Sequence, residues 1–524
     1  MDVVYYKGAL YPLPLDDNEN LNAGEVPVKN LVDICAEKIV QDSTTTSRAL
    51  DAVPRDLCYN LMKAALLNTR DRSIEVLISR WPWRVISLKK LAPPLFDSIK
   101  ALYDDEYIKV QMRKGVKCTT CLAHTFVECL KKRSPTQLKY LDMTGFPAAE
   151  VIMDYLSSHV LLVSNEARQK QIITMYNEVT ADLPVDQRRV YNIDTTLPDE
   201  SFAICLDAYI QNPESHMEFC RALETSKTDV CGFRLQVNSL DLSNLGVARI
   251  CVLLQQVNPV KMTQLCIQYN SISNNGLSVL APAVQRLTSL TCLDLSCNNI
   301  VINSSRDDIA VLMGEMIGAL PLLQRLNLSN NRLKQKLYRV LGNLQKPLQY
   351  LNLCGCGLSQ QDLLFLARSQ HSTHLQELDL SENSIGSGLP SLMTLIQAIS
   401  GNIRTLEMEG CSFFQADLVN LMSVLPRCSQ LLYLNLARNT ELVKDVVEQI
   451  MNCLASLRSF KAWKVSFPVE VYYASADYDS LKEEQTSFEN RLASSLNVLC
   501  KGNNRENIQV HLVEMLKAVE NSML

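Results

Sequence analysis

The feature that most constrains the fold is the spacing of leucines in residues 323–333, which read LQRLNLSNNRL. Leu326 and Leu328 alternate with Asn327, and this alternation places both leucines on one face of a short strand while Asn327 faces the other way. Asn331 follows where the chain turns away, and its amide can satisfy backbone groups of that turn that would otherwise lack a partner. A unit this small cannot bury its own leucines, so similar units must stack on either side.

Copies of this pattern recur through the second half of the chain. Their frames begin at residues 237, 262, 290, 323, 348, 375, 403 and 431, so successive frames are 25 to 33 residues apart. In two copies Cys356 and Cys411 occupy the asparagine position. Steps of this length leave room for a helix after each strand. The sequence therefore predicts an α/β leucine-rich repeat fold, a horseshoe solenoid of strand-plus-helix repeats with the strands on its concave side.

The repeat pattern weakens toward the C-terminus. In this interpretation the regular repeats occupy residues 236–465, and residues 466–524 form a C-terminal cap. The cap is expected to contain a helix at 483–499 and a last strand at 508–512.

The pattern is also irregular before the regular repeats. An earlier frame, LKYLDMTGF at 138–146, indicates an N-terminal cap and degenerate repeats over 68–235. Polar segments at 165–189 and 303–308 are predicted to be insertions. Residues 1–27 are rich in Pro, Asn and acidic residues and are predicted to form a flexible leader.

Bulk composition argues against several classes of partner. The formal net charge is −5 and the pI is about 5.8, so the chain lacks the basic footprint of a protein that binds nucleic acid or an anionic membrane. It shows neither an apolar run of about 18 residues nor a signal-peptide pattern. The 18 cysteines are scattered singly, often at leucine-type positions, which is typical of buried, reduced thiols. We therefore expect a cytoplasmic protein, with the nucleus as a second compartment.

A search for catalytic motifs finds no phosphate-binding loop, serine-hydrolase elbow or zinc-protease helix. Cys118 and Cys121 form a CxxC pair, but no second pair stands at zinc-finger spacing, so buried packing is the favoured interpretation. His371 and His374 fit a solvated loop between repeats. We expect no enzyme activity, cofactor or metal.

The N-terminal segment, residues 28–67, carries two short apolar patterns. In the first, Leu31, Cys35 and Ile39 lie along one stripe of a helix predicted over 28–41. A large, a small and a large side chain in this order allow a partner helix or groove to approach closely at the middle.

The second pattern opens a second helix, which the polar residues 42–47 are expected to separate from the first. It consists of Val53, Pro54, Leu57 and Leu61, with the proline at the helix start. Each pattern alone also fits an amphipathic helix packed on the repeat array, and this alternative remains open.

In this order the two patterns resemble the elongin C-binding box and the cullin box of ubiquitin-ligase substrate receptors. The first place of the elongin box prefers Ala, Pro, Ser or Thr, whereas this chain has Asn30. Arg55 and Asp56 follow Pro54, so the second proline of the cullin-5 form is missing and the cullin-2 form is matched. The resemblance implies that elongin C is bound by Leu31, Cys35 and Ile39, and cullin-2 by Val53, Pro54, Leu57 and Leu61.

Longer segments resemble the PRAME family. They read AVPRDLCYNLMKAAL, RWPWRVISLKKL and LKYLDMTGF near the start, and LPRCSQLLYLNLARN and FPVEVYYASADYDSL near the end. The likeness covers about residues 28–512, with gaps in the middle. Members of this family act as substrate receptors of cullin-2–RING ubiquitin ligases. The resemblance implies the same role here, with elongin C, elongin B, and cullin-2 with its RING protein as partners. The rival hypothesis is a free-standing leucine-rich repeat scaffold or inhibitor that binds one protein.

The residues between the strand leucines predict where a protein target would bind, because they face away from the core. Five of them on neighbouring repeats are carboxylates, which would form a negative patch for a basic target segment. Aromatic residues beside the patch would supply anchors. Any single Asp or Asn between strand leucines also fits solvated scaffold. The candidate target-binding residues are Glu377, Asp379, Glu382, Glu407, Glu409, Tyr433, Arg438 and Trp463.

Overall fold

The computed structural model describes residues 30–91, 99–102, 104–131, 137–148, 150–163, 202–227, 233–302, 307–439, 442–474, 478–503 and 507–514. The chain divides into two compact units, an N-terminal unit of residues 1–101 and 105–265 and a C-terminal unit of residues 102–104 and 266–524. The predicted leader, the insertion at 165–189 and most of that at 303–308 lie outside the described residues.

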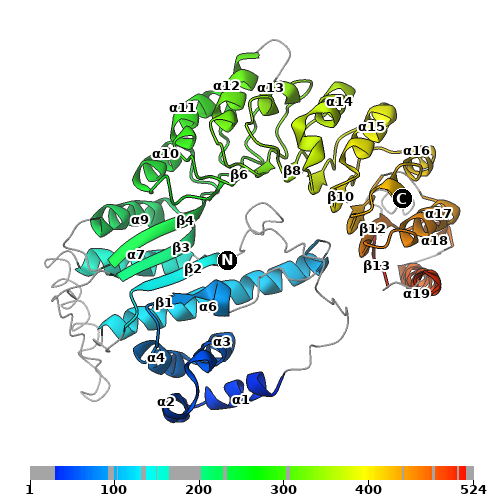
Figure 1. The fold of residues 1–524 in the computed structure, drawn as a ribbon. Helices are drawn as coiled ribbons and strands as arrows, with labels where there is room; N and C mark the ends of the chain where they lie inside the picture. The colour runs from blue at the N-terminus through cyan, green and yellow to red at the C-terminus, as the bar shows by residue number, and fades with distance from the viewer. Residues whose placement is uncertain are drawn as a thin grey trace. The chain divides into compact units, whose positions relative to one another are not determined.

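The N-terminal unit begins with helices and continues as alternating strands and helices (Figure 1). The first helices are α1 (Leu31–Ile39), α2 (Ser43–Ala52), the 3-10 turn η1 (Arg55–Leu57), α3 (Cys58–Leu67) and α4 (Asp71–Ser79). They are followed by β1 (Val85–Ser87), α5 (Leu88–Leu91), η2 (Ile99–Leu102), α6 (Asp105–Lys131), β2 (Tyr140–Ala148), α7 (Glu150–Val163), β3 (Phe202–Tyr209), α9 (Pro213–Ser226), β4 (Phe233–Asp241), α10 (Val247–Gln256) and β5 (Gln264–Cys266). Strands β1 to β4 pair in chain order, and every pair is parallel.

The C-terminal unit repeats one strand and one helix, with the strands on one side and the helices on the other (Figure 1). The repeats comprise α11 (Ser273–Gln285), β6 (Cys292–Asp294), α12 (Asp307–Gly318), β7 (Arg325–Asn327), α13 (Leu337–Leu341), β8 (Tyr350–Asn352), α14 (Gln360–Arg368), η3 (Gln370–Thr373), β9 (Glu377–Asp379), η4 (Gly386–Gly388), α15 (Leu389–Ile399), β10 (Thr405–Glu407), α16 (Gln415–Leu421), η5 (Leu425–Arg427), β11 (Tyr433–Asn435), α17 (Lys444–Ala455) and β12 (Ala462–Ser466). The unit ends with α18 (Val469–Tyr473), α19 (Tyr478–Gly502) and β13 (Gln509–Val513). None of the helices within the described ranges is long and apolar enough to cross a bilayer.

The strands of the C-terminal unit hold one apolar ladder in register. Each strand from β6 to β12 is parallel to the next, and the second residue of each faces the core. The ladder consists of Leu293, Leu326, Leu351, Leu378, Leu406, Leu434 and Trp463. This arrangement confirms the predicted leucine-rich repeat fold, with strands at the predicted frames.

The asparagine of each frame links neighbouring repeats. Asn383 is fully buried, and its amide nitrogen donates to the carbonyl oxygens of Leu380 and Leu353, both at 2.9 Å. Its amide oxygen accepts from the Leu358 N–H at 3.0 Å. Where cysteine replaces asparagine, the thiol still donates: Cys411 Sγ lies 3.2 Å from the Leu380 carbonyl oxygen. The side chain thus satisfies backbone groups that no strand or helix pairs.

One prediction for the N-terminal unit was wrong. The polar stretch at 42–47 does not merely separate two helices, because it forms the first half of α2. Asp42 caps this helix by accepting a hydrogen bond from the Thr45 N–H at 2.7 Å. Thr46 is completely buried. The run of small hydroxyl residues therefore begins a helix that packs closely.

Replacing Asn383 tests the role of the frame asparagine. Asn383→Ala should lower the free energy of unfolding by about 3 kcal/mol, because it leaves several buried backbone groups without partners. Asn383→Cys should cost clearly less, because a thiol can still donate as Cys411 does. Urea unfolding followed by circular dichroism measures both. Equal losses in the two variants would contradict this assignment.

Candidate functional site

Two surfaces carry the predicted site residues, one in each unit. The docking surface, defined as the exposed residues of α1 together with residues 53–57, belongs to the N-terminal unit. The strand face, defined as the outward-facing residues of β7 to β12 and the turns that follow them, belongs to the C-terminal unit.

Helix α1 presents its large apolar side chains to solvent. Leu31 is 75% exposed, Ile34 is 50% exposed and Val32 is 44% exposed. Cys35 is exposed as well, and Ile39 is half-buried. A helix that merely caps a repeat array would turn these side chains inward. The exposed apolar face is instead typical of a helix that docks in a partner's groove.

The opposite face of α1 is fixed to its own unit. Ala36 and Val40 are buried, and α1 packs on α3. The helix begins at Asn30, whose side-chain oxygen accepts a hydrogen bond from the Asp33 N–H at 2.8 Å. Asn is among the best N-cap residues, so it does here what Ser or Thr would do at the first place of an elongin box.

Hydroxyl groups anchor the C-terminal end of α1. Ser73 Oγ, on α4, donates to the Val40 carbonyl oxygen at 2.8 Å. Thr46 Oγ1, on α2, lies 3.1 Å from the Ile39 carbonyl oxygen and 3.1 Å from Ser73 Oγ. These contacts fasten the C-terminal end of α1 to α2 and α4. The sequence does not reveal these contacts, because Thr46 lies in the polar stretch that was expected to separate two helices.

The predicted cullin-binding residues do not share one environment. Pro54 is exposed, and Val53 and Leu57 are half-buried, where α2 ends and η1 leads into α3. Leu61 is only 2% exposed and belongs to the helical core, so the prediction that it contacts a partner is corrected. Most of α3 is buried, and a residue four positions after Leu57 already lies beneath the surface.

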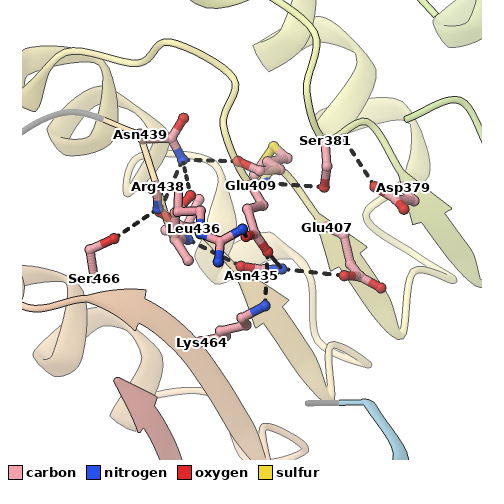
Figure 2. A network of polar contacts seen from close by, with 12 residues as sticks. Asp379, Ser381, Glu407, Glu409, Asn435, Leu436, Arg438, Asn439, Lys464 and Ser466 are labelled. Carbon is pink, nitrogen blue, oxygen red and sulfur yellow. Dashed lines mark hydrogen bonds and ion pairs between the residues drawn. The ribbon is translucent and has the colours of Figure 1, made fainter. Parts of the chain in front are cut away.

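The strand face carries two clusters of ion pairs. The Arg325 guanidinium forms two hydrogen bonds with the Glu377 carboxylate, at 2.8 and 3.2 Å, and stacks 4.3 Å from the centre of the Tyr350 ring. In the second cluster Glu409 accepts from Lys464 Nζ at 2.9 Å and pairs with Arg438 at 3.1 Å (Figure 2).

Asn435 connects Glu409 to a further carboxylate. Its amide nitrogen lies 2.9 Å from Glu409 Oε2 and 3.3 Å from Glu407 Oε2 (Figure 2). Burial opposes the ionisation of Glu409, but hydrogen bonds from Asn435 and Lys464 outweigh it and lower the pKa of Glu409.

Three carboxylates remain outside these ion pairs. Among the described residues, cations pair with Glu377 and Glu409, and none pairs with Asp379, Glu382 or Glu407. Asp379 and Glu407 stand directly opposite each other on β9 and β10. Burial and the charge of Glu407 raise the pKa of Asp379 to about 7, although the Ser381 hydroxyl and N–H favour the ionised form. The strand face is therefore less negative than the sequence suggests.

The two predicted aromatic anchors are not accessible. Trp463 stands in register with Leu434, faces the core and is 1% exposed. Tyr433 is completely buried between its neighbours. The reason is visible in the sequence, since FKAWKV at 460–465 is an LxxLxL frame in which phenylalanine and tryptophan occupy leucine positions. The prediction that these side chains contact a target is corrected, whereas Arg438 is exposed.

The remaining cysteine and histidine patterns have structural roles. Cys118 and Cys121 are buried on α6, and the Cys121 thiol donates to Asp71 Oδ1 at 2.9 Å. His371 is buried rather than solvated, and its Nδ1 accepts from the Leu348 N–H at 3.1 Å. The described residues contain no group of three or more side chains suited to hold a metal ion.

Comparison with known proteins extends this picture. The family model of the PRAME C-terminal domain matches residues 303–504, and a leucine-rich repeat model matches residues 286–300. The sequence is 28% identical over 467 residues to leucine-rich repeat-containing protein 14 of Xenopus laevis, covering 85% of this chain and 89% of that protein. This chain is a leucine-rich repeat protein that is similar to proteins of the PRAME family.

Other similarities are lower in sequence identity. The human leucine-rich repeat-containing protein 14 is 26% identical to this chain over 464 residues, covering 84% of this chain and 88% of that protein. Human PRAME family member 8 is 20% identical over 409 residues, covering 76% and 78%. A solved structure, the leucine-rich repeat-containing protein LegL7 from Legionella pneumophila, matches with a TM-score of 0.35 and 20% identity, covering 52% of this chain and 85% of that chain.

The raised pKa of Asp379 predicts a pH-dependent stability. A carboxyl group whose pKa is raised by folding stabilises the folded state at low pH, and that contribution is lost as pH rises through about 7. Asp379→Asn should therefore unfold at a higher temperature than the parent chain at pH 8, and the difference should shrink toward pH 4. Thermal unfolding at several pH values measures this effect. A constant difference at all pH values would contradict it.

Proposed function

We propose that this PRAME-related protein is the substrate-recognition subunit of a cullin-2–RING ubiquitin ligase. In this proposal α1 binds elongin C, which brings elongin B, and residues 53–57 bind cullin-2. The cullin-2 rather than the cullin-5 assignment follows from Arg55 and Asp56, which stand where the cullin-5 form has its second proline. The observation that carries the proposal is the exposed apolar face of α1.

The chain itself would not transfer ubiquitin. The RING module of the assembly would bring a charged conjugating enzyme near the target, and the repeat unit would raise the local concentration of that target. We place the assembly in the cytoplasm, with the nucleus as a second compartment, because the described cysteines are free thiols. The rival function is a free-standing repeat protein that binds and inhibits one partner. Co-expression of the full chain with elongin B and elongin C separates the two, because only a receptor co-purifies with both.

Leu31 is the main anchor in this proposal. Truncating a buried apolar anchor costs about 2 kcal/mol or more, so Leu31→Ala should abolish co-purification of elongin B and elongin C. Val498→Ala is a matched control, since Val498 is 71% exposed on α19 while Leu31 is 75% exposed. Both variants should keep the unfolding temperature of the parent chain. Normal elongin capture by Leu31→Ala would favour the free-standing scaffold.

The target would bind the strand face through a segment rich in Lys and Arg. Glu382 and Glu407 supply most of the charge, because Glu377 and Glu409 already pair with cations of this chain and the pKa of Asp379 is raised to about 7. With all groups ionised, the five carboxylates and the three cations Arg325, Arg438 and Lys464 give the strand face a local net charge of −2. The patch therefore steers a basic segment more weakly than five free carboxylates would.

Charge removal at the strand face tests this part of the proposal. Glu382→Gln combined with Glu407→Gln should slow the association of a labelled Lys/Arg-rich peptide severalfold at low salt and flatten its salt dependence. Glu489→Gln, an exposed change on α19, should leave both quantities unchanged. Fluorescence anisotropy in stopped flow measures the rates, with a Gln-substituted peptide as reference. Unaltered rates in the double variant would exclude this surface.

A further inference from the structure

A cluster of three aromatic rings lies beside the residues proposed to bind the cullin. Tyr59, on α3, lies 4.6 Å from Trp83 and 5.3 Å from Trp81, measured between ring centres. The two tryptophan rings are 5.2 Å apart. Trp81 is buried, and its indole N–H donates to the Val85 carbonyl oxygen at 3.0 Å. Trp81 therefore belongs to the core of the N-terminal unit.

The other two rings differ from Trp81 in their exposure. Tyr59 and Trp83 are half-buried, so each keeps part of its ring at the surface. The side chains that follow Trp83 are also accessible, with Arg84 exposed and Val85 43% exposed. An aromatic surface held in place by a buried tryptophan is preorganised for contact, because its rings lose little freedom on binding.

This aromatic surface lies close to the docking surface along the chain. Leu57 ends η1, and Tyr59 lies two residues later on α3. Arg80 fastens the turn that carries Trp83 to α2, because Arg80 Nη1 donates to the Ser47 carbonyl oxygen at 2.8 Å and Arg80 also pairs with Asp51. Val53 follows directly at the end of α2.

Exposed arginines occur on the elements that surround this segment in the chain. They are Arg48 on α2, Arg55 in η1 and Arg84 directly after Trp83; the Asp56 carboxylate is exposed as well, while Asp51 is engaged by Arg80. Tryptophan, tyrosine and arginine are the residues that most often dominate binding energy at protein interfaces. The charge favours a partner face that carries carboxylates beside apolar side chains.

We propose that Tyr59, Trp83 and Arg84 extend the cullin-binding surface beyond Val53, Pro54 and Leu57. The inference rests on the proposed function and deepens it, because it assigns part of the cullin affinity to residues outside the box pattern. In this arrangement the rings receive apolar side chains of the cullin, and Arg84 pairs with a carboxylate beside them. In this proposal Val53, Pro54 and Leu57 make the first contact with the cullin. The aromatic surface adds affinity and favours a cullin whose surface is complementary to it.

The test measures binding of purified cullin-2 to the full chain already assembled with elongin B and elongin C. Trp83→Ala and Arg84→Glu should each weaken cullin binding about tenfold or more, without changing elongin capture. Arg221→Glu, a charge reversal at an exposed position on α9, is the matched control and should have no effect. If Trp83→Ala lowers the unfolding temperature, its loss of cullin binding could come from unfolding. The result for Arg84→Glu then tests the proposal, because Arg84→Glu alters only an exposed side chain.

The double variant Pro54→Ala with Leu57→Ala distinguishes a failure of the aromatic surface from a failure of the proposed function. If it loses the cullin while Trp83→Ala and Arg84→Glu keep parental affinity, the aromatic surface is excluded and the proposed function stands. If the parent chain captures neither elongin nor cullin, the proposed function fails and this inference fails with it. A change in self-association of Arg84→Glu, seen by light scattering while cullin affinity stays parental, would instead assign the surface to a second copy of the chain.

Discussion

The hydrogen bonds of the frame asparagine are the interaction on which the repeat array depends. Strands β6 to β11 are each only three residues long, and buried carbonyl oxygens of the following turn, such as those of Leu353 and Leu380, receive their hydrogen bond from a side chain. Asn331 and Asn383 each reach carbonyl oxygens of their own repeat and of the preceding one. Every repeat is therefore registered on its neighbour by a side chain as well as by the strand, and the leucine ladder can stay in line. The position accepts cysteine because a thiol can still donate a hydrogen bond to a carbonyl oxygen, although it lacks the amide oxygen that accepts one.

The repeat fold could be predicted from the sequence because its signal is local and periodic. Leu326, Leu328 and Asn331 specify strand, core and turn within a few residues. The same pattern was not recognised where other apolar residues replace leucine at the core positions. Phe460, Trp463 and Val465 continue the frame with larger side chains, so Trp463 seemed to be a surface anchor although it fills the core. The prediction for Thr46 was wrong for the opposite reason. This polar residue is buried because its hydroxyl group forms hydrogen bonds.

The candidate sites could be predicted only in part, because pairing between side chains depends on distances across several repeats. The sequence placed the acidic residues on one face, but it could not reveal that Arg325 lies within reach of Glu377, two strands away, or that Glu409 holds two cations. The exposure of each side chain could not be predicted either, since Leu31 and Leu61 are both apolar members of helical patterns. One is open to solvent and the other lies in the core, because α3 is surrounded by helices and α1 is covered on one side only.

The long ion pairs of the strand face also have a mechanical consequence. Arg325 and Glu377 join β7 to β9 across β8, and Glu409 and Lys464 join the β10 repeat to β12 across β11. Each pair thus clamps three repeats into one block, beyond the nearest-neighbour coupling of an ordinary solenoid. The joint between the blocks is the step from β9 to β10, where no ion pair among the described residues spans the strands and the carboxyl group of Asp379, with its raised pKa, faces that of Glu407. Under a pulling force, or on gradual unfolding, the C-terminal unit should part first at this joint and release its repeats in threes.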